Sequence, residues 1–432
     1  MNNIFSEFQP TSETEWKDAL KQALKGPSVE EALHYNDPIE AIHYKAYTHP
    51  TNAKSTEETP GQMPYTRGGK FSSNHFEIVN IVPSGKASQR NKSALDLLMK
   101  GATSIRIDLE NHTPEECAEI IKGIGFEFII TTFICYTTEQ FNWVTSLRNE
   151  KNTGRIHAFA TEEITAVDGM RTRLIDGTQV TNAGGNCKQE LAYLLHEGHT
   201  QLFELISKGK SADDAAAQLK FRIGIGSNYF FQIAKIRAFR HLWSTLVAEY
   251  KPTHSCSHIP FIEAETSTLN KSVKDPYTNL LRLTTEALSA IIAGIDELTV
   301  LPYDWGTQQP HLEKSQRLST NISLILKEES YLEKVVDPGG GAYALEALTS
   351  ELEDEGWKLF QQVEQKGIAL LQTEISKTVA IRKAQFESGK TTLIGINKFS
   401  NPEKVENEWL APKKLIFGQE LILERDLTTA KA

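Results

Sequence analysis

The stretch that decides the fold of this 432-residue chain reads LKFRIGIG at residues 219–226 and continues directly as SNYFFQIAKIRAFRHLW at 227–243. The first run is short, rich in aromatic and β-branched residues and interrupted by glycine, which predicts a strand. The second run has apolar residues at helical spacing, which predicts a helix over 229–249. A strand that leads straight into a helix is the repeating unit of parallel α/β folds.

The same unit recurs along most of the chain. Further helical patterns lie around residues 88–100, 114–123, 138–148, 186–207, 276–293 and 311–328. Only ten residues separate the fourth strand from the fifth, so we expect one helix there to be missing or vestigial. Eight such units can close into a (β/α)₈ TIM barrel, and a doubly wound sheet is the alternative. The predicted strands are Phe76–Pro83, Ser104–Leu109, Phe126–Ile134, Arg155–Ala160, Arg171–Asp176, Leu219–Gly226, His258–Ala264 and Leu298–Pro302.

Three segments are expected: an N-terminal arm over 1–60, the barrel over 61–400 with C-terminal helices, and an outgoing linker over 401–432. In the extended arm, Ser12-x-x-Glu15 is a capping-box pattern, and Gly26-Pro27 should end the helix that it starts. The helix carries one apolar stripe of Trp16, Leu20 and Leu24. A single short helix cannot bury such a stripe, so it should lie on the rest of the chain or on another subunit.

Composition excludes several classes of protein. The chain has 46 basic and 56 acidic residues and a net charge of −10, which disfavours nucleic-acid binding. No apolar run is long enough to span a membrane, and no secretory signal is evident at the start. Four cysteines form no CxxC pair, and HSCSH (254–258) lacks a second pair at zinc spacing. We therefore expect a cytoplasmic protein with reduced thiols and no structural metal.

The pattern alone singles out no catalytic pair. In a parallel barrel, function lies where strand carboxyl ends meet the following loops. The polar residues expected there are Asp108, His157, Asp176, Ser227, Asn228, Glu263, Glu265 and Asp304. Gly224-Ile-Gly226 is only half of a dinucleotide fingerprint, because Tyr229 stands at the third glycine position. On the following helix, Arg237 and Arg240 could meet an anionic partner or could cover apolar surface with their stems.

Five ordered motifs resemble the barrel domain of the methylmalonyl-CoA mutase family. PGQMPYTRGG (60–69) is similar to the family's P-x-x-P-Y/F-T-R-G segment, and NAGGNCKQELAY (182–193) to its A-G-A helix start. The helix at 227–243, the run at 275–304 and ESYLEKVVDPGGGAY (329–343) follow in order. The resemblance implies a (β/α)₈ barrel threaded by the CoA chain of the substrate, with adenosylcobalamin carried on a separate domain. Tyr65, Thr66 and Arg67 would then be vestigial CoA contacts.

Departures from the family pattern bear on activity. Catalytic members have a Tyr-His pair before A-G-A, where this chain has Thr178 and Gln179. After T-R-G they have P-Y-A-T, where this chain has Gly-Lys70-Phe-Ser, and a lone cation in a dry radical site would be costly. The sequence also contains no D-x-H-x-x-G, the family's cobalt-binding motif. The degenerate positions are thus Lys70, Thr178 and Gln179, and we predict no catalytic, cofactor-binding or metal-binding residue.

The resemblance therefore implies a non-catalytic small subunit of a heterodimeric mutase. Adenosylcobalamin is expected in its partner, the catalytic large subunit, which the arm would embrace. Two alternatives stay open: an active acyl-CoA mutase barrel that works with a separate cobalamin-binding chain, and a module that binds a CoA ester. The sequence also leaves open whether the barrel channel admits such an ester.

Overall fold

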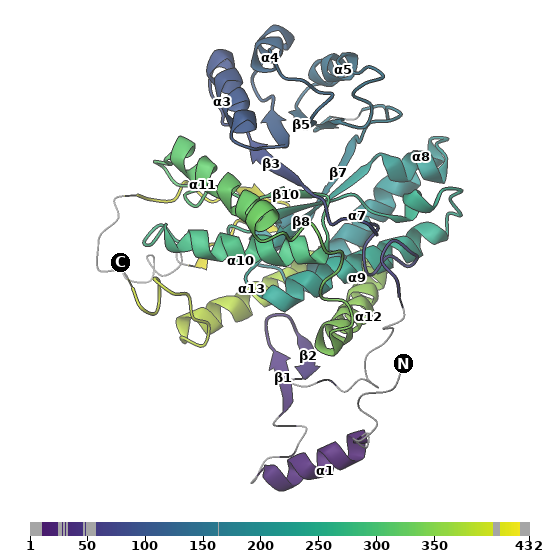
Figure 1. Cartoon of the computed structure of the whole chain (residues 1–432), viewed down its shortest axis with the longest axis vertical. Coiled ribbons are helices and arrows are strands. Elements are labelled where there is room, and N and C mark those ends of the chain that lie inside the picture. The colour runs from purple at the N-terminus through teal and green to yellow at the C-terminus, as the bar shows by residue number, and fades with distance from the viewer. Residues whose placement is uncertain are drawn as a thin grey trace.

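The structure is a computed structural model that describes residues 11–24, 28, 31, 33–45, 48, 58–162, 164–400 and 407–423. Eight parallel strands form one sheet in the order β6-β5-β4-β3-β10-β9-β8-β7 (Figure 1). All eight predicted strands are present, and the barrel is confirmed over the doubly wound alternative. The strands are β3 (Glu77–Ile81), β4 (Ser104–Asp108), β5 (Ile130–Cys135), β6 (Ile156–Ala160), β7 (Arg173–Asp176), β8 (Leu219–Ile225), β9 (Ile262–Thr266) and β10 (Glu297–Thr299).

The barrel closes weakly at the seam between β6 and β7. One parallel bridge joins His157 to Arg171, and the Ala158 N–H donates to the Arg171 carbonyl over 3.1 Å. No helix is formed by the described residues between the two strands, as the short spacing predicted. The sheet is therefore a nearly closed barrel with one thin seam.

Helices follow the strands and cover the outside of the sheet. Three helices differ from expectation. The short α6 and α8 were not predicted, and α10 begins two residues late because the Thr278 hydroxyl donates to Asp275 in a preceding turn (2.5 Å). Its last residue, Ala293, agrees with the predicted limit of 293, and Gly294 follows it with φ 82°. The helices are α3 (Ala87–Met99), α4 (Pro114–Ile120), α5 (Thr138–Ser146), α6 (Thr178–Asn182), α7 (Cys187–Ser207), α8 (Ala212–Ala217), α9 (Tyr229–Ala248), α10 (Thr278–Ala293), α11 (Leu312–Leu324), α12 (Tyr343–Lys366) and α13 (Ala369–Glu387), with a 3₁₀ turn at Ser255–His258 and a π turn at Ile325–Glu329.

Two large hydrophobic clusters hold the described part of the molecule together, beside a third, small cluster of Leu269, Phe386, Leu421 and Leu423. The larger one lies around α7, α9 and α12 and includes Phe221 packed on Trp243, with ring centroids 4.6 Å apart. The smaller one lies between β4–β6 and helices α3–α5 and includes Ile107 and Phe133. Figure 1 shows α3, α4 and α5 together at one end of the molecule, away from α12 and α13. Residues from about 82 to 170 thus form a lobe with a core of its own.

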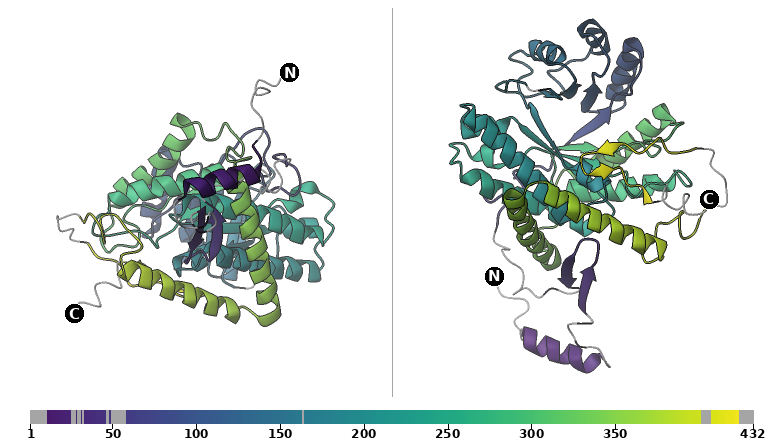
Figure 2. Two further views of the ribbon diagram at one scale, coloured as in Figure 1. Left: turned by 90° about the horizontal axis from the view of Figure 1, so that it is seen from below. Right: turned by 180° about the vertical axis from the view of Figure 1, so that it is seen from behind.

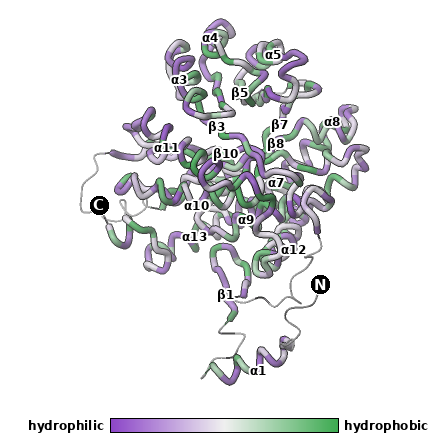
Figure 3. Tube along the Cα trace, viewed as in Figure 1, coloured by the Kyte–Doolittle hydropathy of each residue, from purple (hydrophilic) through white to green (hydrophobic). Residues whose placement is uncertain are grey.

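The N-terminal arm extends from the opposite end. The capping box is confirmed at α1 (Glu13–Ala23), where Ser12 and Glu15 bond each other's backbone amides. No residue of α1 is buried, and its trace mixes hydrophilic and hydrophobic residues (Figure 3). The hairpin of β1 (His34–Asp37) and β2 (Ile42–Lys45) lies between α1 and the barrel in Figure 1 and in the right-hand view of Figure 2. The predicted helix end at Gly26-Pro27 lies outside the described residues.

The C-terminal residues 407–423, here called the C-terminal strap, lie against the barrel. They include the short strands β11 (Lys414–Leu415) and β12 (Gly418–Gln419). Phe417, Leu421, Ile422 and Leu423 are all buried. The strap is thus the described part of the predicted outgoing segment, and the limits of that segment stay a prediction. Among the helices in the described ranges, none is long and apolar enough to span a bilayer.

Candidate functional site

The inside of the barrel is lined by charged side chains. In a strand, alternate residues point to opposite faces. In β8 and β9, Ile223 and Ala264 face the helices and belong to the larger hydrophobic cluster, so the alternate positions face the barrel axis. We call the inward set the interior ion-pair network: Arg106, Asp176, Lys220, Arg222, Glu263, Glu265 and Glu297.

Glu263 is the hub of this network. Its carboxylate pairs with the Lys220 ammonium at 2.8 Å, with the Arg222 Nε at 3.2 Å and with the Arg106 guanidinium at 3.0 Å. It also accepts a hydrogen bond from the Thr299 hydroxyl over 2.8 Å. Lys220 and Glu263 are completely buried. Three cations therefore converge on one carboxylate at the centre of the barrel.

Several of these contacts cross the barrel axis. Arg106 on β4 reaches Glu263 and Glu265 on β9, two strands that are not neighbours in the sheet. Lys220 on β8 lies 3.4 Å from the Thr132 hydroxyl on β5 and also pairs with Glu297 on β10. Because both spans pass through the middle, the long side chains occupy the space along the axis.

The pKa shifts in the network follow from burial and charge. Burial alone would raise the pKa of Glu263, but Arg222, Lys220 and Arg106 outweigh it and hold that pKa well below the usual range. Burial raises the pKa of Glu297, and Lys220 offsets this only in part. For Arg222, Glu263 and Asp176 outweigh burial and raise the pKa. Glu263 is thus the carboxylate that the fold holds ionised.

Thr178 and Gln179 lie on α6, directly after β7, at the carboxyl end of the barrel. The Thr178 N–H and hydroxyl both donate to Asp176, over 3.1 and 2.5 Å. Asp176 in turn accepts from Arg222 at 3.0 Å, which ties α6 to the interior network. The side-chain amide oxygen of Gln179 accepts a hydrogen bond from the Ile416 N–H over 3.3 Å. Both side chains are therefore engaged within the chain.

The C-terminal strap crosses this end of the barrel. Near its start, the Leu410 N–H donates to the Gly306 carbonyl in the loop after β10 (2.8 Å). Near its end, the Leu421 N–H donates to the Asn182 carbonyl of α6 (2.7 Å). Between these points Phe417 packs edge-on against Tyr193 of α7, with centroids 5.1 Å apart. The strap thus runs from the loop after β10 to α6, which follows β7.

The T-R-G segment and Lys70 lie at the other end of the barrel. The Tyr65 hydroxyl donates to the Ser255 carbonyl, and Arg67 pairs with Asp337 at 2.6 Å. The buried Thr66 hydroxyl has no partner within the described structure. Lys70 donates to the carbonyls of His75 (2.5 Å) and Ile295 (2.6 Å), just before β3 and β10 begin. The expectation that Lys70 would stand in the same site as Gln179 is therefore corrected, because the two lie at opposite ends.

Three residues that were predicted to lie where strands end and loops begin lie inside strands instead. Glu263 and Glu265 are inside β9, and His157 is the second residue of β6 rather than its end. His157 is buried with its ring 5.5 Å from Phe261, and burial lowers its pKa well below the usual value.

Sequence reasoning missed Arg106, Lys220 and Arg222. The signal was present as alternation of charged and apolar residues in SIRID (104–108), LKFRI (219–223) and IEAET (262–266).

The basic residues of α9 all have partners inside the protein. Arg237 pairs with Asp337 and with Glu346, and Arg240 donates to the carbonyls of Ala293 and Gly294 at the end of α10. Arg237 therefore meets anionic partners, as one interpretation expected, but they are two carboxylates of this chain. Both side chains are buried, so the alternative of a partly solvated helix is wrong. The glycine at position 224 is explained by close packing, because a Cβ there would lie 2.6 Å from the Thr181 hydroxyl.

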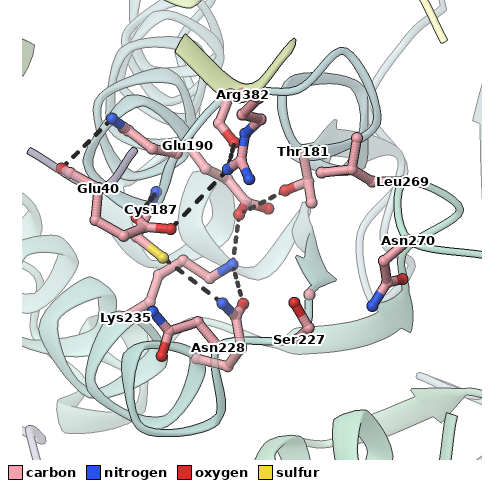
Figure 4. Close-up of a pocket in the computed structure, with 14 residues that line it drawn as sticks. Glu40, Thr181, Cys187, Glu190, Ser227, Asn228, Lys235, Leu269, Asn270 and Arg382 are labelled. Atoms are coloured by element: carbon pink, nitrogen blue, oxygen red, sulfur yellow. Dashed lines mark hydrogen bonds and ion pairs between the residues drawn. The ribbon is translucent and has the colours of Figure 1, made fainter. Parts of the chain in front are cut away.

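A small polar cavity of about 60 Å³ lies beside α6 and the starts of α7 and α9 (Figure 4). Inside it the Lys235 ammonium contacts Glu190 at 2.6 Å and the Gly224 carbonyl at 2.6 Å. Glu190 also accepts from the Thr181 hydroxyl over 2.9 Å. Across the described ranges, no three His, Cys, Asp or Glu side chains are arranged to hold a metal ion.

A sequence model of methylmalonyl-CoA mutase matches residues 130–419. The chain is 30% identical to the methylmalonyl-CoA mutase small subunit of Porphyromonas gingivalis, over 94% of this chain and 72% of that protein. It is 34% identical to the methylmalonyl-CoA mutase of Cereibacter sphaeroides over 52% of this chain, but that match spans only 33% of the relative. The mitochondrial enzyme of Homo sapiens is 27% identical over 92% of this chain and 62% of its own length.

The family match covers more than half of the chain, and the ordered motifs lie on the barrel that those motifs predicted. By sequence and by fold, this chain belongs to the methylmalonyl-CoA mutase family.

Proposed function

We propose that this chain is a non-catalytic small subunit of a heterodimeric, adenosylcobalamin-dependent methylmalonyl-CoA mutase. In this role it stabilises a catalytic large subunit, which interconverts succinyl-CoA and methylmalonyl-CoA. The similarity to the Porphyromonas gingivalis small subunit supports the assignment. A cytoplasmic location goes with it, and the free cysteines Cys117, Cys135, Cys187 and Cys256 favour a reducing compartment.

One observation carries the proposal, namely the interior ion-pair network. A CoA chain that threads a barrel needs an axis lined by small side chains. Here Lys220 and Glu263, both fully buried, meet on that axis, and Arg106 crosses it. Opening the axis would separate buried ions from their partners, which typically costs about 3–5 kcal/mol for each broken pair.

The residues at the carboxyl end do not fit adenosylcobalamin. The strap covers the loops after β7 and β10, and the Gln179 side chain is bonded to the strap itself. Gln179 offers an amide where a catalytic relative would need an imidazole to hold a thioester carbonyl. We therefore derive no radical step on this chain, and we assign the cofactor to the partner. Tyr65, Thr66 and Arg67 are proposed as a vestigial CoA surface, with the Arg67 guanidinium now used by Asp337.

The first test is activity with and without a partner. The purified chain, mixed with adenosylcobalamin and methylmalonyl-CoA, should form no succinyl-CoA. Co-expressed with a cobalamin-binding large subunit, it should co-purify as a heterodimer that is active. Turnover by the chain alone would overturn the proposal and favour the active-barrel alternative.

A second test addresses the degenerate positions. The double variant Thr178→Tyr/Gln179→His restores the residue types of catalytic members. It should remain inactive, because the filled axis and the strap are unchanged. Activity in this variant would mean that these two positions alone had disabled the site.

A further inference from the structure

His157 stands at the bridge that closes the barrel, opposite Arg171 across the seam between β6 and β7. The residue is 1% exposed, and its Nδ1 has no hydrogen-bond partner in the described part of the chain. Its neighbours Ile156 and Ala158 belong to the smaller hydrophobic cluster, so the imidazole faces the barrel axis. On β5 it lies beside Thr132, which carries no charge. The seam therefore closes over a buried imidazole with an unpaired nitrogen.

Phe261, just before β9, brings two cations to the same place. The Arg171 guanidinium lies over the Phe261 ring, 4.3 Å from its centroid, and the Lys220 ammonium lies 5.8 Å from that centroid. The His157 ring meets the Phe261 ring edge-on, with centroids 5.5 Å apart. A proton on His157 would therefore add a third positive charge around one aromatic ring.

The imidazole and the two cations belong to opposite sides of the seam. His157 is part of β6 and moves with the lobe. Arg171 donates to the Leu219 carbonyl at the start of β8 over 2.6 Å, which ties its guanidinium to the larger body. Lys220 is on β8 and pairs with Glu263 on β9. Separation of β6 from β7 would therefore take the imidazole away from both cations.

The carboxylates on this side of the barrel do not offset the two cations. Glu263 is attracted to a charged His157, but it already pairs with three cations of the interior ion-pair network. Glu297 on β10 pairs with the same Lys220 ammonium. Burial, together with the charges of Lys220 and Arg171, lowers the pKa of His157 well below its usual value. The closed seam thus holds His157 as a neutral imidazole.

We propose that His157 is an acid-sensitive switch of the β6–β7 seam. While the imidazole is neutral, it packs beside Phe261 and the seam stays closed. Once protonated, it is repelled by Arg171 and Lys220, and the edge of β6 separates from β7 so that water reaches the ring. Arg106 on β4 keeps its pairs with β9, so the lobe opens at this edge without leaving the barrel. The switch is a property of this chain alone and does not depend on the proposed function.

Acid should favour the open seam. In the open state, water restores an ordinary histidine pKa of about 6.5, whereas the closed state holds the pKa lower. The closed seam is therefore most stable above about pH 6.5, and this stability is lost as the pH falls toward the closed-state pKa. The opening equilibrium should rise about tenfold between about pH 6.5 and about pH 5. Loss of the Glu263 pairs begins only below about pH 4.3, so the two effects are separable.

Hydrogen exchange of the purified chain tests the switch. The Ala158 amide donates across the seam and reports its opening. After correction for the intrinsic exchange rate, its protection should fall about tenfold from about pH 6.5 to about pH 5, while amides in α9 keep theirs. His157→Gln cannot take up the proton and should show no such fall. His112→Gln is the matched control in the same lobe, because His112 contacts only carbonyls such as that of Glu110, and it should behave as the unmodified chain does.

Three results would overturn the inference. One is protection at Ala158 that does not fall in the unmodified chain, a measurement that needs no variant. Another is an equal fall in His157→Gln, or in His157→Phe, which keeps an aromatic ring beside Phe261 and serves if the first variant does not fold. The third is a parallel loss of protection in α9, since acid would then unfold the whole chain instead of opening the seam.

Discussion

Lys220 is the residue on which the interior of the barrel depends most. It is fully buried between Glu263 and Glu297. Lys220→Met should destabilise the fold by about 3–5 kcal/mol, because it leaves two buried carboxylates without their shared cation. Urea unfolding followed by circular dichroism measures this directly.

The matched control for that change is the double variant Lys220→Met/Glu297→Gln. It removes a charge of each sign and should recover part of the lost stability, since a buried pair replaced as a unit costs less than a broken one. If the loss of stability in the double variant equals the sum of the losses in the two single variants, Lys220 and Glu297 do not interact.

Glu263 determines how stability depends on pH. Its pKa is depressed in the folded state, so its ion pairs stabilise the protein fully above the pKa of an unfolded glutamate, about 4.3. That contribution is lost as the pH falls toward the folded pKa, because the unfolded chain then binds the proton more readily. Glu263→Gln should lower stability at neutral pH and flatten the loss of stability below about pH 4.3. Parallel acid curves for the two proteins would rule out Glu263 as the ionised hub.

Single residues were the least predictable level from sequence. The eight strands were identified, but the alternation of charged and apolar residues that marks their inward faces was not used, so Lys220 and Arg222 were overlooked. Lys70 was expected beside Gln179 because both align with catalytic positions of the family. The structure separates them because Lys70 precedes the first strand of the barrel whereas Gln179 follows the fifth.

Among the elements, the C-terminal strap is the one that should open locally when its buried anchoring side chain is removed. Phe417→Ala deletes its buried ring, which in a rigid core would cost about 3–5 kcal/mol. A terminal strap can detach on its own, so the loss should appear as local opening. Hydrogen exchange at the Leu421 amide should speed up, since that amide donates to Asn182.

Ile416→Ala is the control for the strap, because that side chain is exposed and next to Phe417. It should leave the exchange of Leu421 unchanged. Equal acceleration in both variants would mean that Phe417 does not anchor the strap.

Elements with strong local signals were predicted well. The capping box at Ser12, the glycine end of α10 and the missing helix before β7 all follow from local chemistry. The strap could not be predicted, because its short strands pair only with each other and its position depends on loops far away in the sequence. The role of the arm as a partner-embracing element stays a proposal.

At the scale of the whole molecule, the network joins two bodies that have separate cores. Within the sheet, the lobe with the smaller cluster connects to the rest through β3 and through the bridge at the β6–β7 seam. Arg106 crosses from the lobe to Glu263 and Glu265. Arg106→Met should therefore speed hydrogen exchange at the Ala158 amide, which donates across the seam, more than it affects amides in α9. Uniform exchange changes across both cores would argue against a two-body molecule.

The central claim is that the filled barrel accepts no CoA ester. Isothermal titration calorimetry of the purified chain with methylmalonyl-CoA tests it most directly, with the assembled heterodimer as the positive control. The account predicts no saturable heat for the chain alone and binding only when the large subunit is present. Saturable binding of one ester per chain, without a partner, would contradict it.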